Sequence, residues 1–220
     1  MRILLSLLLL TAAFGLLAGP AHAQNAILLA DYVGYGWETG GFLPSNPGDE
    51  LDLVGVADNV ASILGVDLGT TEVTFYIYGL VSTGEFVSGG VTYIAYVGGT
   101  LELWADGAQN SDYGTFPPNG TSPSTFMDGT LLFQGNFTNF QIAITGTGIG
   151  GYEGDLDAVA GTVVQEVCAN CAYTWGGAWT QGVQLVDGYD LQIDGSLQVD
   201  PVVSTEDLSL IHISEPTRPY

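Results

Sequence analysis

An antiparallel β-sandwich or jelly roll of about ten strands, with at most one short helix, is the fold class that this sequence predicts. Three observations support it. Apolar and polar residues alternate with a period of two in many short stretches, as in half-buried strands. The 220 residues include 32 glycines and nine prolines, which separate these stretches as turn residues do. A helical period is almost absent, and many short strands joined by glycine-rich turns are typical of sandwiches and jelly rolls.

The clearest local signal is the stretch Val91–Asp106, in which two apolar-rich segments flank Gly98-Gly99. Two glycines between alternating segments predict a hairpin with a two-residue turn. That turn would pair Tyr93 with Trp104 and place both rings on a solvated face with Glu102. The opposite face is apolar on both segments, as expected for one side of a half-buried sheet.

The remaining elements are predicted from the same alternation. Asp58 can cap a short helix over 58–64, the only helix expected. A three-residue loop over 194–196 would join the last two strands, because it pairs Ile193 with Leu197. The segment 110–128, rich in Pro, Asn, Ser and Gly, is either a functional loop or a packed surface excursion. Further strands are predicted over 26–32, 51–56, 72–78, 130–133, 137–145, 158–167, 172–175, 189–193 and 197–199. The predicted inward side chains are Val73, Phe75 and Ile77 in one strand and Phe140, Ile142 and Ile144 in another.

Both ends of the chain differ in composition from its body. Residues 1–23 combine Arg2, an apolar centre and the small-residue site Ala21-His22-Ala23, which predicts a cleaved secretory signal peptide and an exported, secreted or cell-surface protein. Residues 208–220 (LSLIHISEPTRPY) resemble the translation of a common sequencing adapter. We therefore expect one acidic domain over 24–207, with a non-native tail in place of the true C-terminus.

The body of the chain has an extreme charge balance. Residues 24–207 contain no Lys, Arg or His, and only Glu215 of the 24 acidic residues lies outside them. Such a surface repels nucleic acid and anionic membranes, whose binding depends on Lys and Arg. The same absence excludes Ser-His-Asp and Cys-His catalysis, Schiff-base lysines and arginine clamps for phosphate. A glycoside hydrolase that needs only two carboxylates is the enzyme class that remains.

The two cysteines, Cys168 and Cys171, lie in a Cys-Ala-Asn-Cys motif. In an exported chain this spacing predicts a short-loop disulfide. A redox motif would lie at a helix N-terminus, whereas this motif lies in strand-like sequence. A zinc site would need four ligands, and the body has no histidine to complete one.

Calcium is the cofactor that the sequence favours. Glu153, Asp155 and Asp157 alternate after a glycine-rich turn, and Ca²⁺ binds several such oxygens. The alternative is an exposed acidic turn without an ion. The stretch Asp49-Glu50-Leu51-Asp52 is a weaker second candidate.

Exposed aromatic residues indicate a second kind of site. Sugar-binding β-domains stack Trp and Tyr rings on pyranose rings, beside carboxylates or amides that bind hydroxyl groups. The candidates for this role are Tyr93, Glu102, Trp104, Trp175 and Trp179. The alternative is that these rings are buried, because aromatic side chains bury more area than almost any others.

The phrases VGGTLELWADG and PSTFMDGTLLFQGNF resemble those of bacterial exported β-sandwich proteins with C-terminal sorting signals, such as the PEP-CTERM group. The Pro-Glu-Pro signal, membrane segment and basic end that define that group are absent from this sequence, and no site residue is carried over from it. We expect a non-catalytic structural or adhesive protein, with a polysaccharide or another cell-surface component as partner. The alternatives are a carbohydrate-binding module and a two-carboxylate glycoside hydrolase.

Overall fold

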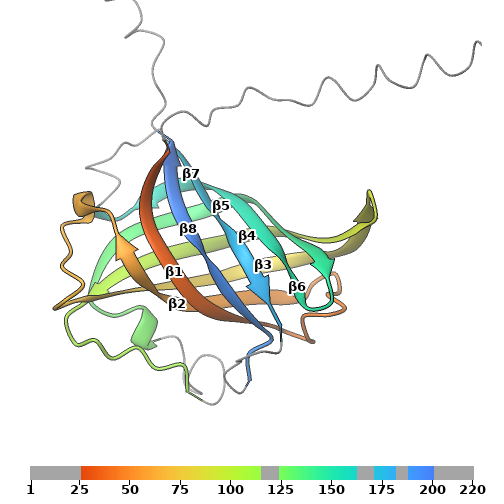
Figure 1. Ribbon diagram of the computed structural model, residues 1–220, viewed down its shortest axis with the longest axis horizontal. Helices are drawn as coiled ribbons and strands as arrows, with labels where there is room; N and C mark the ends of the chain where they lie inside the picture. Colours follow the sequence, from red (N-terminus) through yellow and green to blue (C-terminus); the bar gives the residue numbers. More distant parts are fainter. Residues whose placement is uncertain (1–25, 115–123, 163–170, 182–187, 201–220) are drawn as a thin grey trace, which may run out of the picture.

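The described part of the chain, in a computed structural model, is a closed antiparallel barrel of eight strands (Figure 1). The structure describes residues 26–114, 124–162, 171–181 and 188–200. These residues include two short 3-10 helices, η1 (Ser62–Leu64) and η2 (Ser124–Phe126). None of the described helices is long and apolar enough to cross a bilayer. The strands are β1 (Ile27–Glu38), β2 (Glu50–Val60), β3 (Glu72–Ser88), β4 (Val91–Asp106), β5 (Thr130–Gly146), β6 (Ile149–Ala160), β7 (Ala172–Thr180) and β8 (Leu191–Asp200).

The barrel corrects the predicted sandwich or jelly roll of about ten strands. Each strand pairs with the next in the sequence, and β8 closes the sheet by pairing with β1, with Gly34 opposite Ile193. Alternation shows which side chains face the core, but it does not show whether the last strand meets the first. The strand count was too high because long strands contain glycines in their interiors. The two strands predicted over 130–145 are one strand, β5, and the predicted loop 194–196 lies inside β8.

The predicted hairpin turn at Gly98-Gly99 is also wrong. Val91–Asp106 is one strand, and the turn is Gly89-Gly90, between the paired residues Ser88 and Val91. Gly99 lies mid-strand with a φ of +94°, and a Cβ on it would lie 2.5 Å from Leu80 Cδ2. Both dipeptides provide the positive φ that a tight turn requires. The chain turns at the first, and the second bends the long strand β4.

Large aromatic side chains fill the barrel interior. Trp175 is fully buried and stacks on Tyr32, with ring centroids 3.6 Å apart and planes 5° apart. Phe75 contacts both rings edge-on, at 5.0 and 4.9 Å. Inward-facing glycines make room for these groups, and a Cβ on Gly195 would lie 2.8 Å from the Tyr32 hydroxyl. Interiors of eight-stranded barrels are just wide enough to be filled by side chains.

The connection between β1 and β2 packs against this core. Phe42 is buried and meets the Trp179 ring edge-on at 5.1 Å. Ser45 is also buried, and its hydroxyl donates a short hydrogen bond to the Glu38 carboxylate at the end of β1. The Tyr96 hydroxyl donates a second hydrogen bond to Glu38, with an O···O distance of 2.7 Å. A carboxyl group is therefore fixed inside the fold by two hydroxyl groups.

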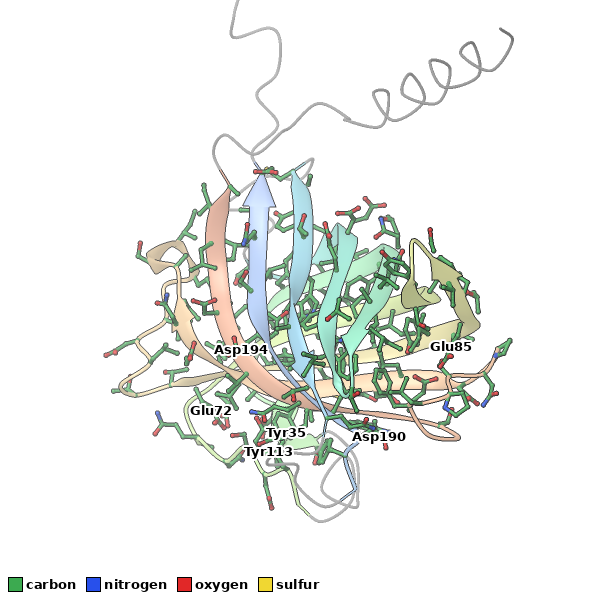
Figure 2. The ribbon with its side chains drawn as sticks, turned by 45° about the vertical axis from the view of Figure 1, so that its right-hand side comes forward. Tyr35, Glu72, Glu85, Tyr113, Asp190 and Asp194 are labelled. Atoms are coloured by element: carbon green, nitrogen blue, oxygen red, sulfur yellow. The ribbon has the colours of Figure 1, made fainter. Side chains whose placement is uncertain are left out.

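One side of the barrel's outer surface is covered. Val54 on β2 and Phe126 of η2 are both fully buried on this side. Tyr35 and Tyr113 meet edge-on at 4.9 Å (Figure 2). The Tyr189 hydroxyl donates a hydrogen bond to the Tyr113 carbonyl at 3.1 Å. The described part of 110–128 therefore packs on the outer face of β1–β3, which is the second of the two alternatives, a packed surface excursion.

Candidate functional site

The outer surface of β4–β8 carries two adjacent hollows. One hollow of about 460 Å³ lies next to a second of about 240 Å³. They share three lining residues, Tyr152, Glu153 and Gly177. The first is also lined by Tyr93, Asn139, Gln141, Ala143 and Gly151, and the second by Thr174, Gly176, Ser196 and Gln198. We call this set of residues the β4–β8 groove.

Small residues in register explain why the surface is hollow there. Ala143 on β5 lies opposite Tyr93 on one side and Gly151 on the other. Gly151 in turn lies opposite Ala178 on β7. Facing residues of neighbouring strands project from the same side of a sheet. A row of alanine and glycine across three strands therefore forms a floor lower than the polar rows beside it.

Two rows of polar side chains run beside this floor. Gln141 lies opposite Glu153, and Asn139 lies opposite Asp155. The amide of Asn139 donates a hydrogen bond of 2.7 Å to the Asp155 carboxylate. The rows continue on β7 and β8, where Thr174 lies opposite Gln198. The polar side chains of these rows are exposed or half-buried, so their amide, hydroxyl and carboxylate groups can contact solvent or a ligand.

An aromatic pair borders the groove at the β3–β4 hairpin. Tyr93 on β4 stacks on Phe86 of β3, with ring centroids 5.4 Å apart and planes 19° apart. Phe86 is 45% exposed, which is unusual for so large an apolar side chain. Tyr93 is half-buried and lines the groove. One end of the groove thus combines a ring face with nearby amide groups.

The structure places two of the predicted sugar-binding residues together, away from this groove. Trp104 Nε1 donates to the Glu102 carboxylate at 3.2 Å. Tyr78 and Gln134 also donate to Glu102, at 3.2 and 2.8 Å. Trp104 and Glu102 therefore lie on the outer face of β4, but Glu102 is buried and not solvated as predicted, because side chains of the protein bind its carboxylate. Tyr93 lies eleven positions from Trp104 on the same strand, so the predicted pairing of these two rings is wrong.

The prediction that Trp175 and Trp179 stack on a ligand is wrong. Their exposed fractions are 0% and 2%, and both side chains point into the barrel. The physical reason is alternation, because positions 173, 175 and 179 share the inward face of β7 with one another. Trp179 Nε1 donates to the Ala143 carbonyl at 3.2 Å, so this tryptophan supports the groove from below.

Several residues of the groove were not predicted from the sequence. Asn139 and Gln141 alternate with the inward Phe140 and Ile142, and Gln198 alternates with Leu197 and Val199. Alternation marks these amides as outward-facing. The sequence has no signal that β5 and β8 contribute to one surface, because that depends on how the barrel closes.

The carboxylates of the weaker metal candidate, Asp49-Glu50-Leu51-Asp52, bind groups of the protein. Asp49 accepts a hydrogen bond from the Asn46 backbone, Glu50 accepts one from Gly79, and Asp52 accepts one from the Tyr76 hydroxyl. Burial, together with the nearby Glu50 charge, raises the pKa of Asp52 to about 7. Glu50 and Asp52 both interact with the Gly79 backbone, but no group of three metal-ligating side chains forms here among the described residues.

The principal metal candidate lies along β6. Its three carboxylates are exposed at alternate positions of the strand, Glu153, Asp155 and Asp157. They therefore point the same way, as predicted for an extended segment. Alternate residues of a strand are about 6.6 Å apart. Among the described residues, no group of three Asp, Glu, His or Cys side chains is arranged to hold a metal ion.

Calcium stabilisation stays a prediction from the sequence, and thermal unfolding in high monovalent salt tests it. Salt screens exposed charges beyond about 10 Å at 0.1 M, so a specific site must raise the midpoint further when millimolar Ca²⁺ is added. The double substitution Asp155→Asn and Asp157→Asn should remove that gain. If monovalent salt alone gives the whole stabilisation, the prediction is wrong.

The structure describes one of the two cysteines of the predicted disulfide. Cys171 is buried and disulfide-bonded. Cys168, its predicted partner, lies outside the described residues.

Comparisons of this chain with protein-family models, with curated proteins and with solved structures found no match. The resemblance to exported proteins with sorting signals therefore stays a prediction. Any functional assignment must come from the chemistry of the barrel surface.

Proposed function

We propose that this protein is an exported, non-catalytic barrel that binds carbohydrate in the β4–β8 groove. One observation carries the proposal: the ring of Tyr93 borders a shallow floor of small residues that is flanked by amide, hydroxyl and carboxylate groups. Sugars present apolar ring faces and hydroxyl groups, which match an aromatic platform with uncharged donors and acceptors. An adhesive role follows if the bound carbohydrate belongs to a cell surface or matrix.

The charge of the chain narrows the ligand class. The body has no Lys, Arg or His, so the groove offers no cation to phosphate, nucleic acid or an anionic lipid. Two-carboxylate hydrolysis remains the second candidate, because Glu153 lines the groove and Asp155 lies beside it. Asp155 is held by Asn139, which favours a structural role for this carboxylate.

Replacing Tyr93 by alanine should abolish most carbohydrate binding. The substitution removes the ring face and leaves the amide rows in place. We expect an affinity loss of about tenfold or more, which corresponds to about 1.4 kcal/mol. A glycan array followed by titration calorimetry on the best ligand measures the loss.

Tyr78→Ala is the matched control. This tyrosine also lies on the outer surface, but it donates to Glu102 and is not part of the groove. It should leave the affinity unchanged. Equal losses in both variants, or no carbohydrate binding by the unmodified protein, would contradict the proposal. Release of reducing sugar from the bound polysaccharide would favour the hydrolase instead.

A further inference from the structure

We propose that the β4–β8 groove binds an internal stretch of a linear polysaccharide that carries no acidic groups. This inference rests on the proposed carbohydrate binding and adds the ligand's length and charge.

The first argument is the length of the groove. The two hollows share Glu153 and Gly177 in their lining, and together their lining extends from Tyr93 on β4 to Gln198 on β8. Neighbouring strands lie about 4.8 Å apart, so five strands span up to roughly 19 Å. That distance exceeds the size of one sugar ring, so a ligand that uses both ends of the groove must be an oligomer.

The second argument is the distribution of hydrogen-bonding groups. They recur on successive strands, as Gln141 on β5, Glu153 on β6, Thr174 on β7 and Gln198 on β8. A chain end is typically recognised by polar groups that converge on one point in an enclosed pocket. Groups repeated at strand spacing instead suit a ligand whose own hydroxyl groups repeat along a chain.

The third argument is charge. Glu153 lies in the groove, and Asp155 lies beside it. Asp194 on β8, labelled in Figure 2, lies opposite Ala178 at the end of the floor. No Lys, Arg or His in residues 24–207 can balance these carboxylates. A uronate or sulfated sugar would therefore meet like charges without a partner. Uncharged sugars avoid this repulsion.

Titration calorimetry with neutral oligosaccharides of two to six sugars tests length. The cello-, xylo- and manno-oligosaccharide series serve as probes. In the series that binds, we expect affinity to rise with length until the chain reaches β8. Gln198→Ala should lower the affinity for the longest oligomer several-fold and leave the disaccharide unchanged, whereas Tyr93→Ala should weaken both.

Asn59→Ala, an exposed amide on β2 outside the groove, is the control for Gln198→Ala and should change neither affinity. Oligogalacturonides of two to six sugars test charge, and at low salt they should bind at least several-fold more weakly than the neutral oligomers of equal length. Binding that does not depend on length, or equal binding of the acidic oligomer, overturns this inference and leaves carbohydrate binding intact. If no oligosaccharide or polysaccharide binds, the proposed function fails together with it.

Discussion

Trp175→Ala should lower the free energy of unfolding by about 3–5 kcal/mol, the usual cost of removing a buried tryptophan. The ring is fully buried between Tyr32 and Phe75. Its Nε1 makes no hydrogen bond to other described residues, so the loss comes from packing and from the cavity that remains. Since whole domains are stable by only about 5–15 kcal/mol, the variant should unfold at a much lower urea concentration.

Trp104→Ala is the control for this substitution. Trp104 is half-buried on the outer face and donates to Glu102. Because solvent can fill the space it leaves, its loss should cost clearly less than that of Trp175. Equal costs for the two tryptophans would show that the barrel interior is not the main source of stability.

The direction of many side chains was predictable from the sequence. Val73, Phe75 and Ile77 face the interior, as the alternation in β3 predicts, and so do Phe140 and Ile142 in β5. Such predictions need only the period of a strand, which is a local property. The same rule, applied to β7, would have placed Trp175 and Trp179 inside.

Closure of the barrel was not predictable in this way. It depends on the pairing of β1 with β8, which brings Tyr32 opposite Gly195 although most of the sequence lies between them. Interior glycines were the available signal, since a Cβ at Gly195 would meet the hydroxyls of Tyr32 and Tyr152. In the sequence these glycines look like turn residues, which led to the prediction of extra, shorter strands.

The candidate site was predictable only in part, for the same reason. Tyr93 was identified as an outward-facing aromatic residue, but its expected partner Trp104 lies on the same strand. The residues that Tyr93 accompanies, such as Gln141 and Ala143, come from β5. A site assembled across five strands becomes visible only when their order and register are known.

Stability should fall as the pH rises from about 4.5 to 7, whereas most proteins are most stable between about pH 5 and 8. Burial, together with the smaller effect of the Asp49 and Asp190 charges, raises the pKa of Glu38 to about 7, although hydrogen bonds from Ser45 and Tyr96 oppose the shift. Burial also raises the pKa of Asp52 to about 7.

The direction of this change in stability with pH follows from proton binding. In the unfolded chain these carboxyls lose their protons near their ordinary pKa values, whereas the folded protein keeps them protonated up to about pH 7. The folded state therefore binds more protons between those limits, and its stability decreases as protons are lost. At about 1.4 kcal/mol per pH unit, Glu38 alone accounts for at most roughly 3.5 kcal/mol. This contribution is complete below pH 4.5 and is lost as the pH passes through 7.

Glu38→Gln should remove much of this decrease, because glutamine never ionises. Ser45 and Tyr96 bind different oxygens of the Glu38 carboxylate, so the amide oxygen of glutamine can accept from one hydroxyl while its NH₂ donates to the other. The variant should be more stable than the unmodified protein at pH 8. Asp157→Asn controls for the loss of one negative charge in so acidic a chain, since Asp157 is exposed on β6. Urea unfolding between pH 4 and 8 compares the three proteins. Equal stabilisation by the two substitutions at pH 8 would mean that general repulsion, and not the buried Glu38 carboxyl, sets the pH dependence.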